Sequence, residues 1–233
     1  MNMTNMVDVH CHILPGIDDG SQNLEETKAM LKMAYDEGIR TIIATPHHHE
    51  TRGKCTLEEL NDRLAVTREL ARQLADDFTI EPGMEVYFSQ DVLDEFGKGI
   101  LQPMGNSNYM LIEFSPAADY GYIKQALQQI QMQGYMPILA HVERYRCLVD
   151  KPALVEHLVD MGVSIQVNAT SVTGGAGWKV KRFIKKLMAY ELVHLVGTDA
   201  HNTNSRKPEM QESALYVTKK FGEAYANRIF CYN

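Results

Sequence analysis

Short β-branched segments alternate with longer amphipathic segments along the chain, and this alternation is the feature that most constrains its fold. We expect seven strands, at residues 6–10, 39–45, 79–87, 109–115, 136–141, 163–168 and 192–199. We expect helices at residues 23–37, 56–76, 119–133, 151–161, 178–190 and 206–221, and a shorter helix or an irregular loop at 89–100. Such alternation is typical of repeated βα units and therefore of an α/β fold with parallel strands.

Helix-end signals agree with these boundaries. Thr56 and Glu59 have the spacing of a capping box, and Gly38, Gly134 and Gly162 stand where a helix-ending glycine is common. The chain of 233 residues holds no Pro/Ser-rich linker, internal repeat or low-complexity tract. A single domain over residues 1–233 is therefore expected.

Charge and cysteine usage exclude several classes of protein. Asp and Glu outnumber Lys and Arg by 30 to 23, which does not favour nucleic acid as a partner. The sequence has no basic leader and no apolar stretch of the roughly 18–20 residues that a membrane span needs. Four cysteines are scattered without CxxC spacing. A cytoplasmic protein without membrane insertion is the simplest interpretation.

Side chains that bind metals recur where the expected strands end. They are His10, His12, His47, Glu85, Glu113, His141 and Asp199, with His201 just beyond the last strand. In a βα barrel the carboxyl ends of the strands converge on the face where such barrels place their chemistry. Residues far apart in the sequence are therefore expected to meet there.

The first two of these residues belong to the segment DVHCHILPGIDDG at residues 8–20. Side chains alternate along a strand, so His10 and His12 point the same way and Cys11 points the other way. Alone, such a pair is weak evidence, because a polar turn after a strand is common. Together with the other strand ends it predicts bound cations, since isolated charges at a barrel mouth cost several kcal/mol unless paired or coordinated.

The donor set also limits the metal. Nitrogen and oxygen donors without a thiolate cluster favour Mn, Fe or Zn. Eight or nine candidate ligands are too many for one ion, so we expect two or three ions with bridging carboxylates. Ions about 3.5–4 Å apart suit hydrolysis, and phosphoester cleavage is favoured over amide or ester cleavage without excluding either.

Two arginines follow these positions closely, Arg144 in AHVERYR and Arg206 in DAHNTNSRKP. A guanidinium group matches phosphate oxygens in charge and geometry, so both are candidate catalytic residues that hold a phosphoryl group. The alternative is a surface ion pair, for example with Glu143 or Glu209. The neighbouring metal positions favour the first interpretation.

The ordered segments DVHCHILPGIDDG, TIIATPHHH, GMEVY, LIEFS, ILAHVERY, QVNATSV and GTDAHN resemble the polymerase and histidinol phosphatase (PHP) superfamily. Within it, the chain most resembles the bacterial CpsB/CapC group of manganese-dependent protein-tyrosine phosphatases, which are associated with capsule and exopolysaccharide synthesis. The resemblance extends from the first strand to about residue 210. It implies a distorted seven-stranded, TIM-barrel-like (β/α)7 barrel, the PHP fold.

The resemblance also implies a centre of three divalent metal ions, with Mn²⁺ favoured and Fe or Zn as alternatives. His10 and His12 match the ligands of the first ion, and Glu85 bridges to a second ion that Glu113 and His141 complete. The third ion would be bound by Asp18, His47 and His201, and Asp199 would supply another carboxylate. Spacing alone does not separate Asp18 from Asp19. Arg144 and Arg206 match the contacts to the substrate phosphate.

The implied activity is hydrolysis of phosphotyrosine by a metal-activated hydroxide. The implied partner is a tyrosine-phosphorylated protein, notably a cognate bacterial tyrosine kinase, and homo-oligomer assembly is left open. No CxxxxxR phosphate loop of ordinary tyrosine phosphatases is present. The alternatives are another PHP phosphoesterase such as histidinol-phosphate phosphatase, a TatD-like metal nuclease, or a scaffold protein that has lost catalysis.

Overall fold

Parallel strands form the centre of the computed structural model, which describes residues 3–231. They are β1 (Met6–Cys11), β2 (Ile39–Ala44), β3 (His47–His48), β4 (Thr79–Pro82), β5 (Glu85–Tyr87), β6 (Tyr109–Glu113), β7 (Met136–Leu139), β8 (Ser164–Asn168) and β9 (Leu195–Gly197). They form two sheets, in the orders β1-β2-β4 and β3-β5-β6-β7-β8-β9, and every pairing between them is parallel. The prediction of an α/β fold with parallel strands is confirmed.

The nine strands fill seven positions around a barrel, because β3 continues the path of β2 and β5 continues the path of β4. The expected strand 79–87 is interrupted at Gly83, where β4 ends and β5 has not begun. A Cβ atom on Gly83 would lie 3.0 Å from Cγ2 of Ile43, so glycine lets the two chains approach closely at this break. In the described residues the (β/α)7 arrangement is thus present, in the distorted form that was predicted.

Contacts between β1 and β9 bring the two ends of the barrel wall together. The amide of Asp199 donates to the carbonyl of His10 at 2.7 Å, and the amide of His12 donates to the carbonyl of Ala200 at 2.9 Å. The buried carboxylate of Asp8 accepts hydrogen bonds from the amide and the hydroxyl of Thr198. Burial raises the pKa of Asp8 to about 6, although these hydrogen bonds act to lower it.

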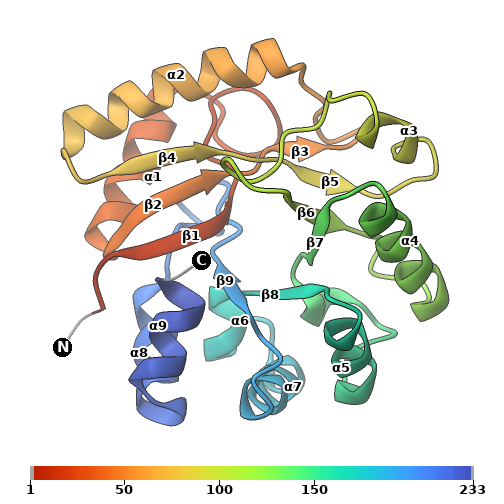
Figure 1. The fold of residues 1–233 in the computed structure, drawn as a ribbon. Coiled ribbons are helices and arrows are strands. Elements are labelled where there is room, and N and C mark those ends of the chain that lie inside the picture. The colour runs from red at the N-terminus through yellow and green to blue at the C-terminus, as the bar shows by residue number, and fades with distance from the viewer. Residues whose placement is uncertain (1–2, 232–233) are drawn as a thin grey trace.

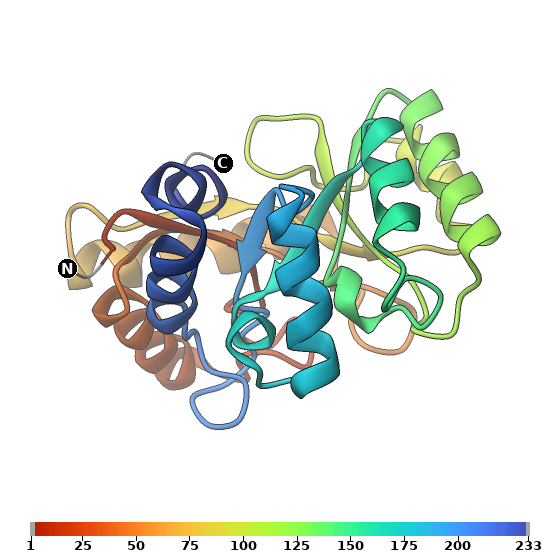
Figure 2. The same cartoon turned by 90° about the horizontal axis from the view of Figure 1, so that it is seen from below.

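Helices surround the strands on the outside (Figure 1, and Figure 2 from below). They are α1 (Leu24–Asp36), α2 (Leu57–Leu74), α3 (Leu93–Phe96), α4 (Tyr120–Met132), the 3₁₀ turn η1 (Val142–Arg144), α5 (Pro152–Asp160), α6 (Ala169–Thr173), α7 (Trp178–Ala189), α8 (Gln211–Phe221) and α9 (Glu223–Phe230). Their apolar faces pack against the strands in one large cluster of buried residues. Cys11 lies in this cluster, so the prediction that its side chain points away from the histidine pair is confirmed.

Several helix boundaries agree with the sequence signals. Thr56 and Glu59 form the expected capping box of α2, and Gly38, Gly134 and Gly162 all have positive φ. The expected helix 206–221 begins only at Gln211, because the side chain of Asn202 accepts hydrogen bonds from the next amides and holds that segment as a loop. Helix α9 was not predicted. Among the described residues, no helix has the length and apolar character required to cross a bilayer.

Candidate metal centre

The carboxyl ends of the strands bring nine side chains together, eight of them buried and one exposed. These nine residues, which we call the metal centre, are His10, His12, Asp19, His47, Glu85, Glu113, His141, Asp199 and His201. All except Asp19 are at most 5% exposed. Eight of the nine predicted ligands are in this set, and Asp18 is not. The sequence therefore predicted correctly which strand ends meet.

Four overlapping groups of ligand atoms lie within the metal centre, and the atoms of each group are within 4.8 Å of one another. The groups are His12, Asp19, His47 and His201; His10, His12 and Glu85; His10, His141 and Asp199; and His47, Glu85 and Glu113. Such sharing of ligands is what several closely spaced ions require. The ligand role of each residue stays a prediction, while their convergence is observed.

Glu85 occupies the middle of the centre. Its Oε2 lies 3.3 Å from Nε2 of His10, 3.3 Å from Nε2 of His12 and 2.9 Å from Nδ1 of His47. Its Oε1 lies 2.9 Å from Nε2 of His141. A carboxylate with four imidazoles around it is placed to bridge cations.

Several buried polar atoms of the centre have no hydrogen-bond partner. They are Oε2 of Glu85, Nδ1 of His47, Nδ1 of His141 and Nε2 of His201. Nδ1 of His47 and Oε2 of Glu85 are 2.9 Å apart but lack hydrogen-bond geometry. Buried polar atoms are normally satisfied, and these belong to residue types that bind divalent metals through nitrogen or oxygen. The donor set therefore fits divalent ions.

The electrostatics of the centre are strongly perturbed. Burial lowers the pKa of His12, but the carboxylates of Asp18 and Glu85 outweigh this and raise it to about 10. Burial and the charge of His12 lower the pKa of His201 to about 2. Burial acts to raise the pKa of Glu85, yet contact with His10 holds it well below its usual range. Such opposed shifts in one small volume are typical of functional sites.

Asp18 and Asp19, which the sequence could not separate, differ clearly in the structure. Asp18 is engaged elsewhere: its carboxylate accepts from Nδ1 of His12 at 2.7 Å, the amide of His47 at 2.8 Å and the amide of Gly20 at 2.9 Å. Asp19 Oδ1 instead lies 3.3 Å from Nε2 of His47 and 3.4 Å from Nε2 of His201. The choice of Asp18 as a ligand is thus not supported, and Asp19 takes that place in the geometry. Asp18 orients His12 so that Nε2 faces the centre.

Arg144 and Arg206 both donate to the carboxylate of Asp199, Arg144 to Oδ2 and Arg206 to Oδ1 at 2.7 Å. The alternative ion pairs with Glu143 and Glu209 are not formed: Glu143 accepts from the amide of Asn168, and Glu209 pairs with Lys207. The two guanidinium groups thus lie directly beside the metal centre. Their contact with a substrate phosphate stays a prediction.

Arg52 is a third arginine at the centre, and sequence reasoning missed it. Its guanidinium group donates to Glu113 and lies 3.4 Å from Nε2 of His47. An antiparallel bridge between His49 and Gly53 turns this loop back over the site. No feature of the sequence distinguishes Arg52 from a solvated loop arginine.

Three other histidines lie outside the centre. Nε2 of His48 lies 2.5 Å from Glu95, Nδ1 of His157 lies 2.7 Å from the hydroxyl of Tyr120, and Nδ1 of His194 accepts from the amide of Ile165. None of the three belongs to a group of ligand atoms among the described residues.

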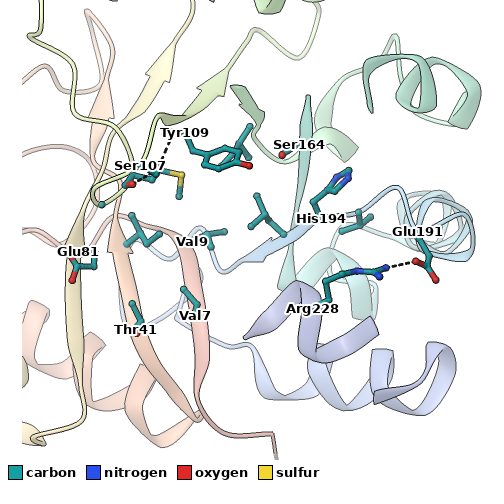
Figure 3. Close-up of a pocket in the computed structure, with 16 residues that line it drawn as sticks. Val7, Val9, Thr41, Glu81, Ser107, Tyr109, Ser164, Glu191, His194 and Arg228 are labelled. Atoms are coloured by element: carbon teal, nitrogen blue, oxygen red, sulfur yellow. Dashed lines mark hydrogen bonds and ion pairs between the residues drawn. The ribbon is translucent and has the colours of Figure 1, made fainter. Parts of the chain in front are cut away.

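Two cavities mark opposite ends of the barrel. One of about 610 Å³ opens beside the metal centre and is lined by Asp18, Asp19, Arg52 and His201, among others. A larger one of about 800 Å³ is lined by the strands nearer their amino ends, with Val7, Val9 and Tyr109 on its wall (Figure 3). The larger cavity shares no residue with the metal centre, so the chemistry belongs to the smaller one.

Comparison with known proteins gives one family and close relatives. Residues 6–233 match the family described as capsular polysaccharide synthesis, CpsB/CapC. Tyrosine-protein phosphatase CpsB of Streptococcus pneumoniae is 36% identical over 98% of this chain and 96% of its own length. Tyrosine-protein phosphatase YwqE of Bacillus subtilis is also 36% identical, over 93% of this chain and 85% of its own length.

The structural comparison agrees. The crystal structures of YwqE from B. subtilis and CpsB from S. pneumoniae, described as unique metal-dependent tyrosine phosphatases, include a chain with a TM-score of 0.87 and 33% identity. That match covers 95% of this chain and 90% of the other. Dihydropyrimidinase from Brevibacillus agri, at 12% identity and a TM-score of 0.57, shares the fold alone.

Proposed function

Because the chain belongs to the CpsB/CapC family of capsular polysaccharide synthesis proteins, we propose that it is a metal-dependent tyrosine-protein phosphatase. The single observation that carries this function is the metal centre, in which nine side chains from the ends of several strands converge with arginines directly beside them. The enzyme is a hydrolase of phosphoric monoesters on tyrosine.

We propose three divalent ions, with Mn²⁺ favoured. His12, Asp19, His47 and His201 would hold one ion, and the other two would share His10, Glu85, Glu113, His141 and Asp199. When bound, such ions supply Lewis acidity toward phosphoryl oxygens and a water of lowered pKa as nucleophile. The polar partners outside the centre, such as Asp18 on His12, fix which imidazole nitrogen faces the ions.

The arginines would hold the phosphoryl group. Arg144 and Arg206 converge on Asp199, whereas Arg52 lies on Glu113, so guanidinium groups stand at two different carboxylates of the metal centre. Charge on the phosphoryl oxygens grows toward the transition state, and fixed guanidinium groups stabilise it without reorganisation. Cys11, which stands between His10 and His12, is not placed to act as a nucleophile: its side chain lies in the core, and burial raises its pKa well above the usual range.

The substrate we propose is a tyrosine-phosphorylated protein, in particular a bacterial tyrosine kinase that controls capsule or exopolysaccharide synthesis. The names of the relatives support a tyrosine-phosphorylated substrate, and the description of the family supports a role in capsular polysaccharide synthesis. We also propose that residues 1–233 form a single domain and that the protein acts in the cytoplasm, where its unpaired cysteines, all free among the described residues, would stay reduced.

A substrate panel tests the proposed function. Phosphotyrosine peptide, histidinol phosphate and single-stranded DNA are each incubated with the protein in Mn²⁺ and in EDTA. We expect release of phosphate from the peptide in Mn²⁺ only, and no cleavage of DNA. A preference for histidinol phosphate would replace the proposed substrate and leave the fold and the metal centre unaffected.

The two neighbouring aspartates give a second prediction. Asp19→Asn removes a ligand, so one equivalent of bound metal is expected to be lost. Asp18→Asn keeps all ligands but loosens His12, so the number of bound ions is expected to stay the same while metal affinity falls by about 10- to 100-fold. Elemental analysis and calorimetric titration with Mn²⁺ measure both quantities. Loss of one equivalent of metal in Asp18→Asn but not in Asp19→Asn would instead identify Asp18 as the ligand.

A further inference from the structure

Strand β8 contributes no residue to the metal centre, yet it carries two buried amide side chains next to it. Gln166 is fully buried and Asn168 is 5% exposed. They are two residues apart on one strand, so their side chains point to the same face. Together, Gln166 and Asn168 contact three residues of the metal centre. These are His10 in β1, His141 after the end of β7 and Asp199 after the end of β9.

Gln166 has a fixed orientation. Its Nε2 donates to the carbonyl of Val167 at 2.8 Å and to Oδ1 of Asn168 at 3.0 Å, while its Oε1 accepts from the amide of His141 at 2.6 Å. The Oε1 atom also lies 3.4 Å from Nδ1 of His10. Because Oε1 can only accept, Nδ1 of His10 carries the proton, and Nε2 of His10 keeps its lone pair toward the centre.

Asn168 continues this contact to the other side of the site. Its Oδ1 accepts from Gln166, so its Nδ2 is turned toward Asp199 and donates to Oδ2 at 2.9 Å. The amide of Asn168 is in turn held by the carboxylate of Glu143 at 2.9 Å. The result is a continuous run of hydrogen bonds from His10 through Gln166 and Asn168 to Asp199.

The two residues beside β8 also have unusual backbone conformations. His141 has φ +31° and Asp199 has φ +55°, in the left-handed region that non-glycine residues rarely adopt. A residue in this conformation is strained and persists only where the surroundings hold it. The side chain of Gln166 holds the backbone amide of His141, and the side chain of Asn168 holds the carboxylate of Asp199.

From this geometry we propose that Gln166 and Asn168 are positioning residues, which set the tautomer of His10 and the placement of His141 and Asp199 for metal binding. The inference rests on the proposed metal-dependent function. Both residues are neutral, so they orient ligands without adding charge to a centre that already contains four carboxylates. Their effect is exerted through the ligands that they contact.

Three variants at these positions separate positioning from packing. Gln166→Met keeps the length of the side chain but removes the acceptor for His10 and His141. Gln166→Glu keeps that acceptor, loses the donors to Val167 and Asn168 and adds a negative charge. Asn168→Asp keeps the shape and places an oxygen where Asp199 now receives a hydrogen bond. The matched control is Gln131→Met. Gln131 lies near the end of α4, and the substitution removes the hydrogen bond that its side chain donates to the carbonyl of Met161.

Calorimetric titration of chelator-stripped protein with Mn²⁺ measures the effect, and long-range ¹H–¹⁵N spectra of the imidazoles in metal-free protein at alkaline pH report the tautomer of His10. We expect Gln166→Met and Asn168→Asp to lower Mn²⁺ affinity by about 10- to 100-fold, and Gln166→Met to abolish the single Nδ1-protonated form of His10. Gln166→Glu should bind Mn²⁺ more tightly than Gln166→Met, and the control should match the unmodified protein.

Wild-type Mn²⁺ affinity in both Gln166→Met and Asn168→Asp would overturn the inference, as would an unchanged His10 tautomer in Gln166→Met. If Gln166→Met does not fold, the Mn²⁺ affinities of Asn168→Asp and Gln166→Glu still test the inference, because both substitutions preserve the volume of the side chain. If the unmodified protein binds no divalent ion, the proposed function fails instead, so the two failures are distinguishable.

Discussion

The Glu85→Gln variant is expected to lose turnover of phosphotyrosine almost completely. Glu85 contacts four imidazoles of the metal centre and belongs to two of its four groups of ligand atoms. Loss of its charge removes a bridge between ions, so at least one equivalent of metal should be lost as well. Loss of a group that only orients a ligand lowers activity by about 10- to 100-fold. We expect the loss of turnover in Glu85→Gln to be larger than that.

Metal content and the rate of phosphate release from a phosphotyrosine peptide measure this effect. Glu81→Gln is the control, because Glu81 lies in β4, pairs with Arg68 and is outside the metal centre. The control should keep both turnover and metal content. A Glu85→Gln protein that retains its full complement of metal would show that Glu85 does not bridge the ions.

The Arg144→Ala and Arg206→Ala variants are each expected to lower kcat/KM by about 10²- to 10³-fold without loss of metal. Both guanidinium groups contact Asp199, and each would supply fixed positive charge to the phosphoryl group. Lysine in either place keeps the charge but loses the planar fork, so Arg144→Lys and Arg206→Lys should recover only part of the activity.

Steady-state kinetics together with elemental analysis check this prediction. Arg182→Ala, which removes an exposed side chain paired with Asp150, is the control and should behave as the unmodified protein. If the Arg144 and Arg206 variants lose metal in proportion to activity, the arginines stabilise the centre rather than the substrate. Wild-type kcat/KM in both would exclude them from the site.

Much of the site could be predicted from the sequence because the direction of the strands determines where the side chains at their ends lie. The carboxyl ends of parallel barrel strands meet at one face, so residues as distant as His10 and His201 could be placed together from the alternation of strands and helices alone. The same alternation along β1 correctly predicted that Cys11 points away from the histidine pair, and its side chain lies in the core.

The choice between Asp18 and Asp19 could not be made in this way. Both follow β1 in an irregular turn, where neither the period of a strand nor that of a helix applies. Their directions depend on long-range contacts: the amide of His47 donates to Asp18, and Gly53 packs so closely that a Cβ there would lie 2.7 Å from Cβ of Asp18. Such contacts exist only in the folded chain.

Arg52 and the two amides of β8 were beyond sequence reasoning for a related reason. Arg52 reaches Glu113 because the loop folds back between His49 and Gly53, which leaves no periodic signal. Gln166 and Asn168 look like ordinary strand residues in QVNATSV, and their role depends on where β8 stands relative to the ends of β7 and β9. Residues that orient ligands are therefore harder to predict than the ligands.

Titration of metal-free protein with Mn²⁺, followed by phosphotyrosine hydrolysis at each step, tests the central claim most directly. The metal centre predicts no hydrolysis without metal, a rise in rate as ions are added, and saturation near three equivalents per chain. Hydrolysis at full rate in the metal-free protein, or Mn²⁺ binding that leaves the rate at zero, would contradict the assignment of this protein as a metal-dependent tyrosine phosphatase.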